Sequence, residues 1–168
     1  MLDMIRRFAR SAAVGLRVPA LLASLAAAGC GANTGDSACG DIQTEPGPLM
    51  RPGQNCLSCH QDGFGDPDAP VFSAAGTVFS SPQSDHCDGV EGAKIFLAAA
   101  DGTEIELTTN SAGNFWTREP LLAEGPGPRI EFEGRTLKMN RPLPAVAACN
   151  ACHSNPPVGG APGKIFIP

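Results

Sequence analysis

The sequence predicts a mainly β protein in which a small β-sandwich lies between two loop-rich segments. Two observations predict the sandwich: short runs in residues 71–140 alternate apolar and polar side chains, and Gly and Asn turn signals separate these runs. A third observation concerns the flanks, because residues 55–70 lack helical periodicity and residues 141–168 are rich in Pro and Gly. An all-α fold is therefore excluded.

Each expected strand follows from the alternation of its side chains. Residues 93–97 and 104–107 alternate on either side of Asp101-Gly102, a two-residue hairpin signal. Residues 110–113 form a second turn signal and lead into a further run. The expected strands are residues 77–79, 93–97, 104–107, 114–117 and 129–133. Short strands at regular spacing indicate a sandwich.

Two copies of Cys-x-x-Cys-His stand on the flanks, at residues 56–60 and 149–153. This pentapeptide is the attachment pattern of a covalently bound c-type haem. Its spacing lets two thiols reach the two vinyl groups of one porphyrin, and the adjacent imidazole becomes an axial ligand of the iron. We therefore expect two covalently bound haem c groups. Their expected cofactor-binding residues are Cys56, Cys59, His60, Cys149, Cys152 and His153, of which the two histidines bind iron.

Two other uses of paired cysteines fit the sequence less well. Zinc ribbons separate their Cys pairs by ~15–20 residues, whereas Cys59 and Cys149 are 90 positions apart and a histidine follows each pair directly. A thioredoxin-like redox pair needs a βαβ context, which the sequence lacks. The sequence thus indicates a small dihaem protein that does not have the all-α fold of a single-haem cytochrome c.

The N-terminus carries the features of an export signal. Arg6, Arg7 and Arg10 form a basic start, an apolar run of 11 residues spans 18–28, and small residues occupy 26–29. We interpret residues 1–29 as a secretory signal peptide. The apolar run is shorter than the ~20 residues of a transmembrane helix, so we expect no transmembrane anchor.

The signal ends on Cys30, and residues 27–30 (Ala-Ala-Gly-Cys) resemble a bacterial lipobox, although Ala27 stands where leucine is commoner. The resemblance implies cleavage before Cys30 and acylation of this residue, which would anchor the protein to a membrane. The alternative is cleavage after Ala28, with Cys30 left as a plain thiol. With lipidation, residues 30–54 form a lipid-anchored linker, residues 55–168 form the dihaem domain, and the protein lies at the periplasmic face or the outer membrane.

The other cysteines can be accounted for in the same scheme. Of seven cysteines, four belong to the haem motifs, which leaves Cys30, Cys39 and Cys87. If Cys30 carries lipid, Cys39 and Cys87 form a disulfide. Closing that 48-residue span contributes roughly 4 kcal/mol in the chain-entropy picture.

The second axial position of each iron has three candidate distal ligands, His86, Met139 and Met50. His86 is the only histidine outside the motifs, and its alternative role is that of an exposed turn residue. Met139 lies ten residues before Cys149 and either passes round the porphyrin edge or fills a gap in the core. Met50 lies six residues before Cys56, so it reaches its own haem less easily, and the other haem is open to it.

A chain this short has little core of its own. We therefore expect the two haem segments to come together at one end of the sandwich, where the porphyrins replace missing helices. The aromatic residues expected nearest the haems are Phe64, Phe72, Trp116 and Phe166, and simple core packing is the alternative role for each.

Four stretches of the middle section have the form of a known module: residues 75–78 (AGTV), 92–95 (GAKI), 101–104 (DGTE) and 108–115 (TTNSAGNF). They resemble the carboxypeptidase regulatory-like, transthyretin-like β-sandwich over about 65 residues. With the flanking motifs and residues 160–165 (GAPGKI), the mature chain resembles a group of bacterial dihaem lipoproteins. This resemblance implies a scaffolding or binding role for the sandwich and transfers no catalytic residue.

The leading interpretation is electron transfer, not catalysis, by a lipid-anchored dihaem cytochrome c whose partners are other redox proteins of the cell envelope. Removal of residues 1–29 leaves 8 basic and 16 acidic residues, a balance that argues against nucleic acid as a partner. One alternative is a binding or redox-sensing module that contains haem. The other is a small peroxidase-like enzyme, which would need an open iron and distal acid–base residues.

Overall fold

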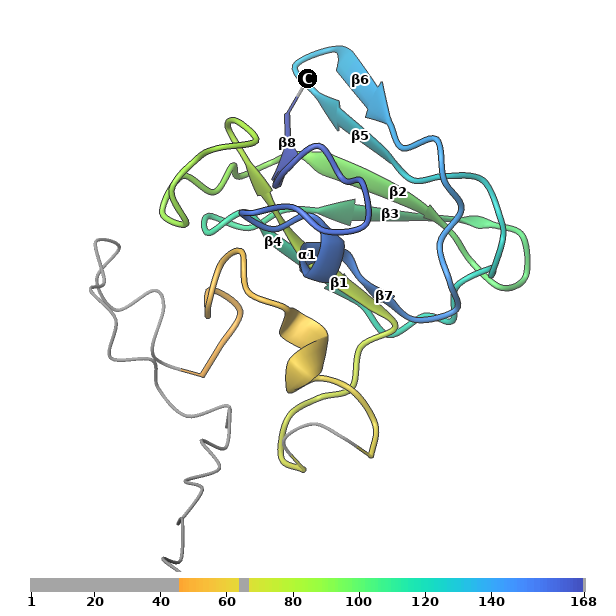
Figure 1. The fold of residues 1–168 in the computed structure, drawn as a ribbon. Helices are drawn as coiled ribbons and strands as arrows, with labels where there is room; N and C mark the ends of the chain where they lie inside the picture. The colour runs from red at the N-terminus through yellow and green to blue at the C-terminus, as the bar shows by residue number, and fades with distance from the viewer. Residues whose placement is uncertain (1–45, 64–66, 168) are drawn as a thin grey trace, which may run out of the picture.

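A computed structural model of the chain describes residues 46–63 and 67–167. It shows two β-sheets packed face to face, with loop-rich segments before and after them (Figure 1). The predicted mainly β fold is confirmed, and it is not an all-α fold.

The first sheet is built around β1 (Ala74–Phe79). On one side β1 pairs antiparallel with β4 (Asn114–Thr117). On its other side it pairs in parallel with two very short strands, β7 (Ala147–Ala148) and β8 (Ile165–Phe166). Every strand of this sheet therefore contacts β1.

The second Cys-x-x-Cys-His motif lies in a loop between β7 and β8. Ala74 of β1 pairs with Ala147, and Val78 pairs with Ile165. The two residues of β1 are four positions apart, whereas their partners are eighteen positions apart. The extra residues leave the sheet and include the single-turn helix α1 (Cys149–Cys152). The motif is thus an insertion into what would otherwise be one parallel strand.

The second sheet has the order β3-β2-β5-β6 and is antiparallel throughout. Its strands are β2 (Lys94–Ala98), β3 (Glu104–Thr108), β5 (Arg129–Phe132) and β6 (Arg135–Lys138). Turns form at both predicted places: Gly102 N–H donates to Ala99 O over 2.9 Å, and Gly113 N–H donates to Asn110 O over 2.8 Å. The first loop has three residues, 100–102, between the bonded Ala99 and Thr103, and not the predicted two. Strands β6, β7 and β8 were not predicted.

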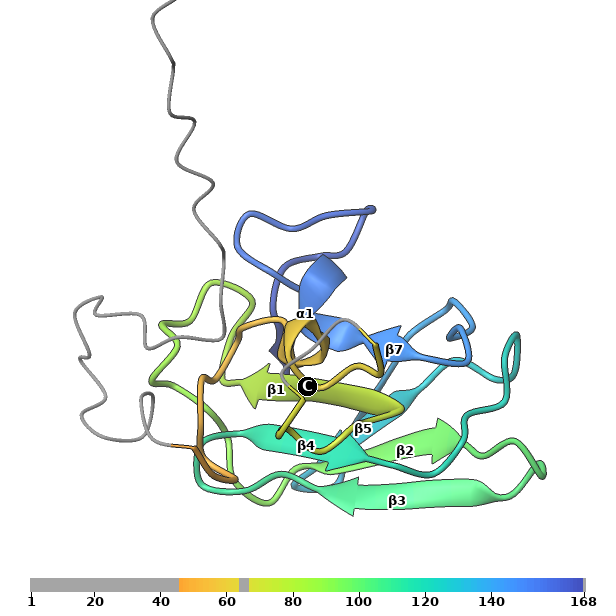
Figure 2. The same ribbon diagram turned by 90° about the horizontal axis from the view of Figure 1, so that it is seen from below.

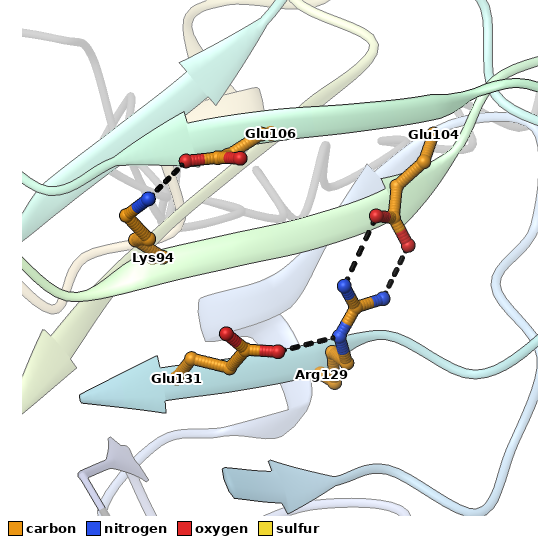
Figure 3. Close-up of polar contacts among 5 residues, drawn as sticks. All are labelled: Lys94, Glu104, Glu106, Arg129 and Glu131. Carbon is orange, nitrogen blue, oxygen red and sulfur yellow. Dashed lines mark hydrogen bonds and ion pairs between the residues drawn. The ribbon is translucent and has the colours of Figure 1, made fainter. Parts of the chain in front are cut away.

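The outer face of the second sheet carries charges that pair with one another (Figure 3). Lys94 Nζ lies 2.7 Å from Glu106 on the neighbouring strand. The Arg129 guanidinium binds Glu104 and lies 3.0 Å from Glu131, and its carbon lies 3.7 Å from the centre of the Phe96 ring. These contacts tie β3, β2 and β5 together and cover the aromatic ring in their midst.

The core lies between the two sheets, and β1 is buried on its second face as well. The core residues from the strands include Ala74, Val78, Ile95, Leu97, Ile105 and Phe115. All six residues of β1 are buried, whereas a sandwich strand with one wet face would alternate. The outer face of β1 is covered by the segment around η2 (Cys56–Ser58), which lies beside α1 (Figure 2).

Gly76 allows α1 to approach β1 closely. A Cβ at this position would lie 2.8 Å from Phe115 Cζ and 2.9 Å from Cys149 Cβ. Such distances require the neighbouring atoms to shift. The absence of a side chain here therefore sets how closely the second motif packs on the sheet.

Replacing Gly76 with alanine should overpack this contact and destabilise the protein by about 1–3 kcal/mol, measured by urea unfolding. The matched control is Thr136→Ser on the exposed strand β6, which should change stability by less than ~0.5 kcal/mol. Equal stability of the two variants would contradict the close packing of α1 on β1.

Candidate functional site

The two Cys-x-x-Cys-His motifs fold in the same way. In each, one helical turn ends with the histidine N–H donating to the carbonyl of the first cysteine over 3.0 Å, from His60 to Cys56 and from His153 to Cys149. Side chains three and four residues apart on a helical turn lie on one face. Both motifs therefore place two cysteines and a histidine on the same side of a turn.

The His60 imidazole is held in one orientation. Its Nδ1 lies 2.7 Å from Pro70 O, its ring stacks on Phe72 with 4.3 Å between centroids, and the residue is only 8% exposed. Because a carbonyl oxygen only accepts hydrogen bonds, Nδ1 carries the proton. The other ring nitrogen, Nε2, is then unprotonated and able to bind a metal.

The His153 imidazole has the same arrangement. Its Nδ1 lies 3.0 Å from Gly163 O, and in both motifs the accepting carbonyl comes ten residues after the histidine. Gly163 has φ +120°, and a Cβ there would lie 2.9 Å from Pro82 O. Glycine is therefore required at the residue that supplies the carbonyl.

A cavity of about 670 Å³ lies in front of the first motif. Cys56, Cys59 and His60 line it. Its other walls include Met50 and Phe72, which precede and follow the motif, and Ala75, Phe115 and Trp116 from β1 and β4. A volume of this size, mostly apolar with a few polar groups, is typical of a cofactor or small-molecule site. Two of the four aromatic residues expected near a haem, Phe72 and Trp116, thus lie beside the first motif.

Met50 lies in the wall of the cavity beside its own motif, although its spacing in the sequence made its own haem the harder one to reach. The loop that carries it is fastened to β4, because Asn114 Nδ2 donates to Met50 O over 3.0 Å and to Pro48 O over 3.3 Å. Asn110 Nδ2 adds a bond of 2.6 Å to Pro48 O. These amides fold the residues before Cys56 back over the cavity, a path that sequence spacing did not reveal.

Thr77, in the middle of β1, joins the first segment to the sheet. Its hydroxyl accepts from Gly53 N–H over 2.8 Å and donates to Asn114 Oδ1 over 2.8 Å. The residue is fully buried. Since a buried polar group without a partner is costly, this hydroxyl favours the docked position of the first segment.

Asn150, between the two cysteines of the second motif, fills the gap that the loop leaves beside β1. Its Oδ1 accepts from Thr77 N–H over 3.2 Å, where a parallel strand would otherwise supply a carbonyl. Its Nδ2 donates to Thr77 Oγ1 over 3.2 Å and to Gln54 O over 2.8 Å. The segments that carry the two motifs meet on β1, whereas the sequence led us to expect them at one end of the sandwich.

The other two candidate distal ligands do not line the cavity. His86 is exposed, with Nε2 3.8 Å from Asp85 Oδ1. Another part of the same loop lies beside the segment whose carbonyl faces His153. Lys164, which follows Gly163, donates from Nζ to Ser84 O over 2.6 Å. Met139 is half-buried where β6 ends, and its N–H donates to Pro128 O over 2.9 Å.

The motif sulfurs are not all in the same state. Cys56, Cys149 and Cys152 are free thiols. Burial raises the pKa of Cys56 to about 11 and that of Cys149 to about 12, the latter with a smaller contribution from repulsion by Cys56. The reactive cysteine of a redox-active Cys-x-x-Cys pair has a lowered thiol pKa. Cys56 and Cys149, the first cysteines of the two motifs, have raised values and therefore lack this property.

Cys59 is disulfide-bonded in the structure, which departs from the expectation that it forms a thioether with haem. A sulfur has to be a free thiol to form that thioether, so the two states exclude each other. Haem attachment at the first motif therefore requires reduction of this disulfide, by exchange with another thiol or thiolate.

Cys87 is also disulfide-bonded, as expected for one half of the predicted pair. Its predicted partner Cys39 lies outside the described residues, as do Cys30, Phe64 and the predicted signal peptide, residues 1–29. Within residues 46–63 and 67–167, no helix has the length and apolar character needed to cross a bilayer. In the same ranges, no three His, Cys, Asp or Glu residues cluster as metal ligands do.

Thr77→Val should destabilise the protein by about 1–3 kcal/mol, because it leaves Gly53 N–H, Asn114 and Asn150 short of a buried partner. The same substitution at the exposed Thr136 of β6 should change stability by less than ~0.5 kcal/mol. Urea unfolding of both variants makes the comparison. A Thr77→Val variant as stable as Thr136→Val would show that the network does not hold the first segment.

No protein-family model, curated protein or solved structure matches the chain. The function is therefore inferred from the geometry of its own residues.

Proposed function

We propose that the protein is a dihaem c-type cytochrome that transfers single electrons in the cell envelope. One observation carries the proposal. At both motifs the histidine Nδ1 faces a backbone carbonyl, at 2.7 Å for His60 and 3.0 Å for His153, and Nε2 is left as a metal-binding nitrogen. A histidine fixed in this tautomer directly after two cysteines on one helical turn is the arrangement that an iron porphyrin requires.

The residues around the first motif fit a porphyrin. The cavity volume, about 670 Å³, lies within the range of cofactor sites. Its wall combines apolar rings and methyl groups with a single imidazole from the motif. Arg51 and Arg118 also line it and have the charge that haem propionates need. When bound, haem supplies a one-electron iron couple whose potential depends on ligands and burial.

The chain has three tasks in this proposal. The cysteines of each motif would hold the porphyrin covalently, and His60 and His153 would each supply an imidazole nitrogen to its iron. Pro70 O and Gly163 O fix each imidazole through Nδ1, which leaves Nε2 as the nitrogen that could bind a metal and increases its basicity. Phe72 packs on the His60 ring and limits access of water to it.

The residues around the second motif are more exposed to solvent than those around the first. This exposure supports the alternative of a sensing module, because a small ligand could reach the iron there. Cys152 is exposed, and Val146 and Val158, which flank the second motif in sequence, are 47% and 56% exposed. An iron with an open distal position would bind carbon monoxide strongly in the reduced protein. An electron carrier with two filled axial positions would not. An enzyme would further need a distal acid–base residue; Asp68 lines the cavity, while His60, the one histidine in the described part of its wall, is assigned to the iron in this proposal.

The membrane attachment in this proposal comes from the sequence. A signal peptide over residues 1–29 and an acylated Cys30 would hold the dihaem domain near a membrane on the linker before it. Redox proteins of the envelope would then be its partners.

The haem content of the exported protein tests the proposal. The mature protein should carry two haems by intact mass and by the spectrum of its pyridine complex. Cys56→Ser/Cys59→Ser and Cys149→Ser/Cys152→Ser should each carry one, because each motif holds its own porphyrin. A colourless wild-type protein, made in cells that attach haem to another c-type cytochrome, would refute the proposal.

Of the three candidate distal ligands, Met50 is the one that lines the cavity beside the first motif, and we infer that it binds that iron. Met50→Leu should therefore remove the far-red sulfur-to-iron band of the oxidised protein and lower one reduction potential, because thioether ligation raises it. Met139→Leu is the matched control and should leave that haem unchanged. Loss of the band in Met139→Leu alone would assign the ligand to Met139 instead.

A further inference from the structure

Segments about a hundred residues apart in the chain are joined by one buried side chain. Asn150 Nδ2 donates to Gln54 O over 2.8 Å, across 96 residues of sequence. Gln54 stands two residues before Cys56, and Asn150 stands directly after Cys149. A single hydrogen bond thus joins the two segments that carry the first cysteine of each motif.

This junction is rigid because it is fixed to the sheet at several points. Asn150 is buried, and all of its hydrogen-bonding atoms on the side chain are used, by Thr77 and Gln54. On the other side of α1, Cys149 Cβ lies where a Cβ on Gly76 would be only 2.9 Å away. The main chain before Cys56 is held by Gly53 N–H, which donates to the Thr77 hydroxyl over 2.8 Å. Neither motif can shift without breaking contacts of the other.

The turns that carry the first cysteine of each motif are neighbours. Cys56 begins η2, Asn150 follows Cys149 in α1, and the bond from Asn150 Nδ2 to Gln54 O joins the two segments over 2.8 Å. A thioether joins each sulfur directly to the edge of its porphyrin. Figure 2 shows the same proximity for the two helical turns, η2 and α1, which lie beside each other on β1.

We propose that Asn150 is a positioning residue that holds the two haem-bearing segments as one unit, so that the two haems form an electronically coupled pair. This rests on the proposed dihaem function and extends it: an electron that enters at one haem is shared with the other inside the protein. Asn150 occupies one of the two x positions of Cys-x-x-Cys-His. Haem attachment does not require a particular residue at these positions.

Circular dichroism in the Soret region tests the coupling. Two chromophores held close in a fixed geometry give a bisignate couplet that neither gives alone. The wild-type protein should show this couplet, and the summed spectra of Cys56→Ser/Cys59→Ser and Cys149→Ser/Cys152→Ser should not. A wild-type spectrum equal to that sum, with two haems present, would overturn the coupling and leave the proposed function intact. Absence of haem from the wild-type protein would overturn both.

The double variant Asn150→Ala/Ala151→Asn tests the role of the side chain. It keeps the composition and both attachment motifs, but it moves the amide from a buried to an exposed position. We expect two haems by intact mass and loss of the couplet, while Ala151→Ser alone retains it. A full couplet in the double variant would overturn the positioning role of Asn150. If the double variant does not accumulate, the comparison of the wild-type protein with the single-haem variants decides whether the pair is coupled.

Discussion

A buried network of hydrogen bonds centred on Thr77 holds the structure together at the place where its chemistry would occur. The Thr77 hydroxyl binds the first segment through Gly53 and the sheet through Asn114, while its N–H and hydroxyl both meet Asn150 of the second motif. The side chains of Thr77, Asn114 and Asn150 are buried, and their polar atoms are hydrogen-bonded to one another and to the main chain of the first segment. Because polar groups buried without partners are costly, such a network is stable only when all its members are in place. The two segments therefore depend on each other and on β1.

The two motifs reach the same local geometry from different surroundings. The first lies before the sandwich and faces a cavity, whereas the second is an insertion between two short strands that pair with the same edge of β1. Yet in both the histidine N–H caps a single helical turn, and Nδ1 meets a carbonyl ten residues later. Two independent segments that orient their imidazoles alike support one chemical role for both. The difference in exposure between them further suggests that they would not have equal reduction potentials, since burial and solvent access tune an iron centre.

Much of the sandwich was predictable, because its strands alternate in sequence. The prediction of residues 114–117 coincides with β4, those for β3 and β5 differ by one residue at one end, and that for β2 is shifted by one residue. Strand β6 was missed because Glu133, rather than Asn or Asp, begins its turn at φ +49°. Strands β7 and β8 have two residues each and leave no periodic signal.

The motif residues of the candidate site were also predictable, since their chemistry is local. Its surroundings were not. The position of Met50 depends on amides of Asn110 and Asn114, and the role of Asn150 depends on a gap in the sheet. Both are long-range contacts that composition and spacing do not record. The carbonyls that meet each Nδ1 follow no residue pattern, because one belongs to proline and the other to glycine.

A crystal structure of the haem-loaded protein would test the central claim most directly. It should show His60 and His153 bound to iron through Nε2, each with Nδ1 still hydrogen-bonded to its carbonyl, and Asn150 still joined to Thr77 and Gln54. Iron bound to other residues, or histidines turned away from Pro70 O and Gly163 O, would contradict it.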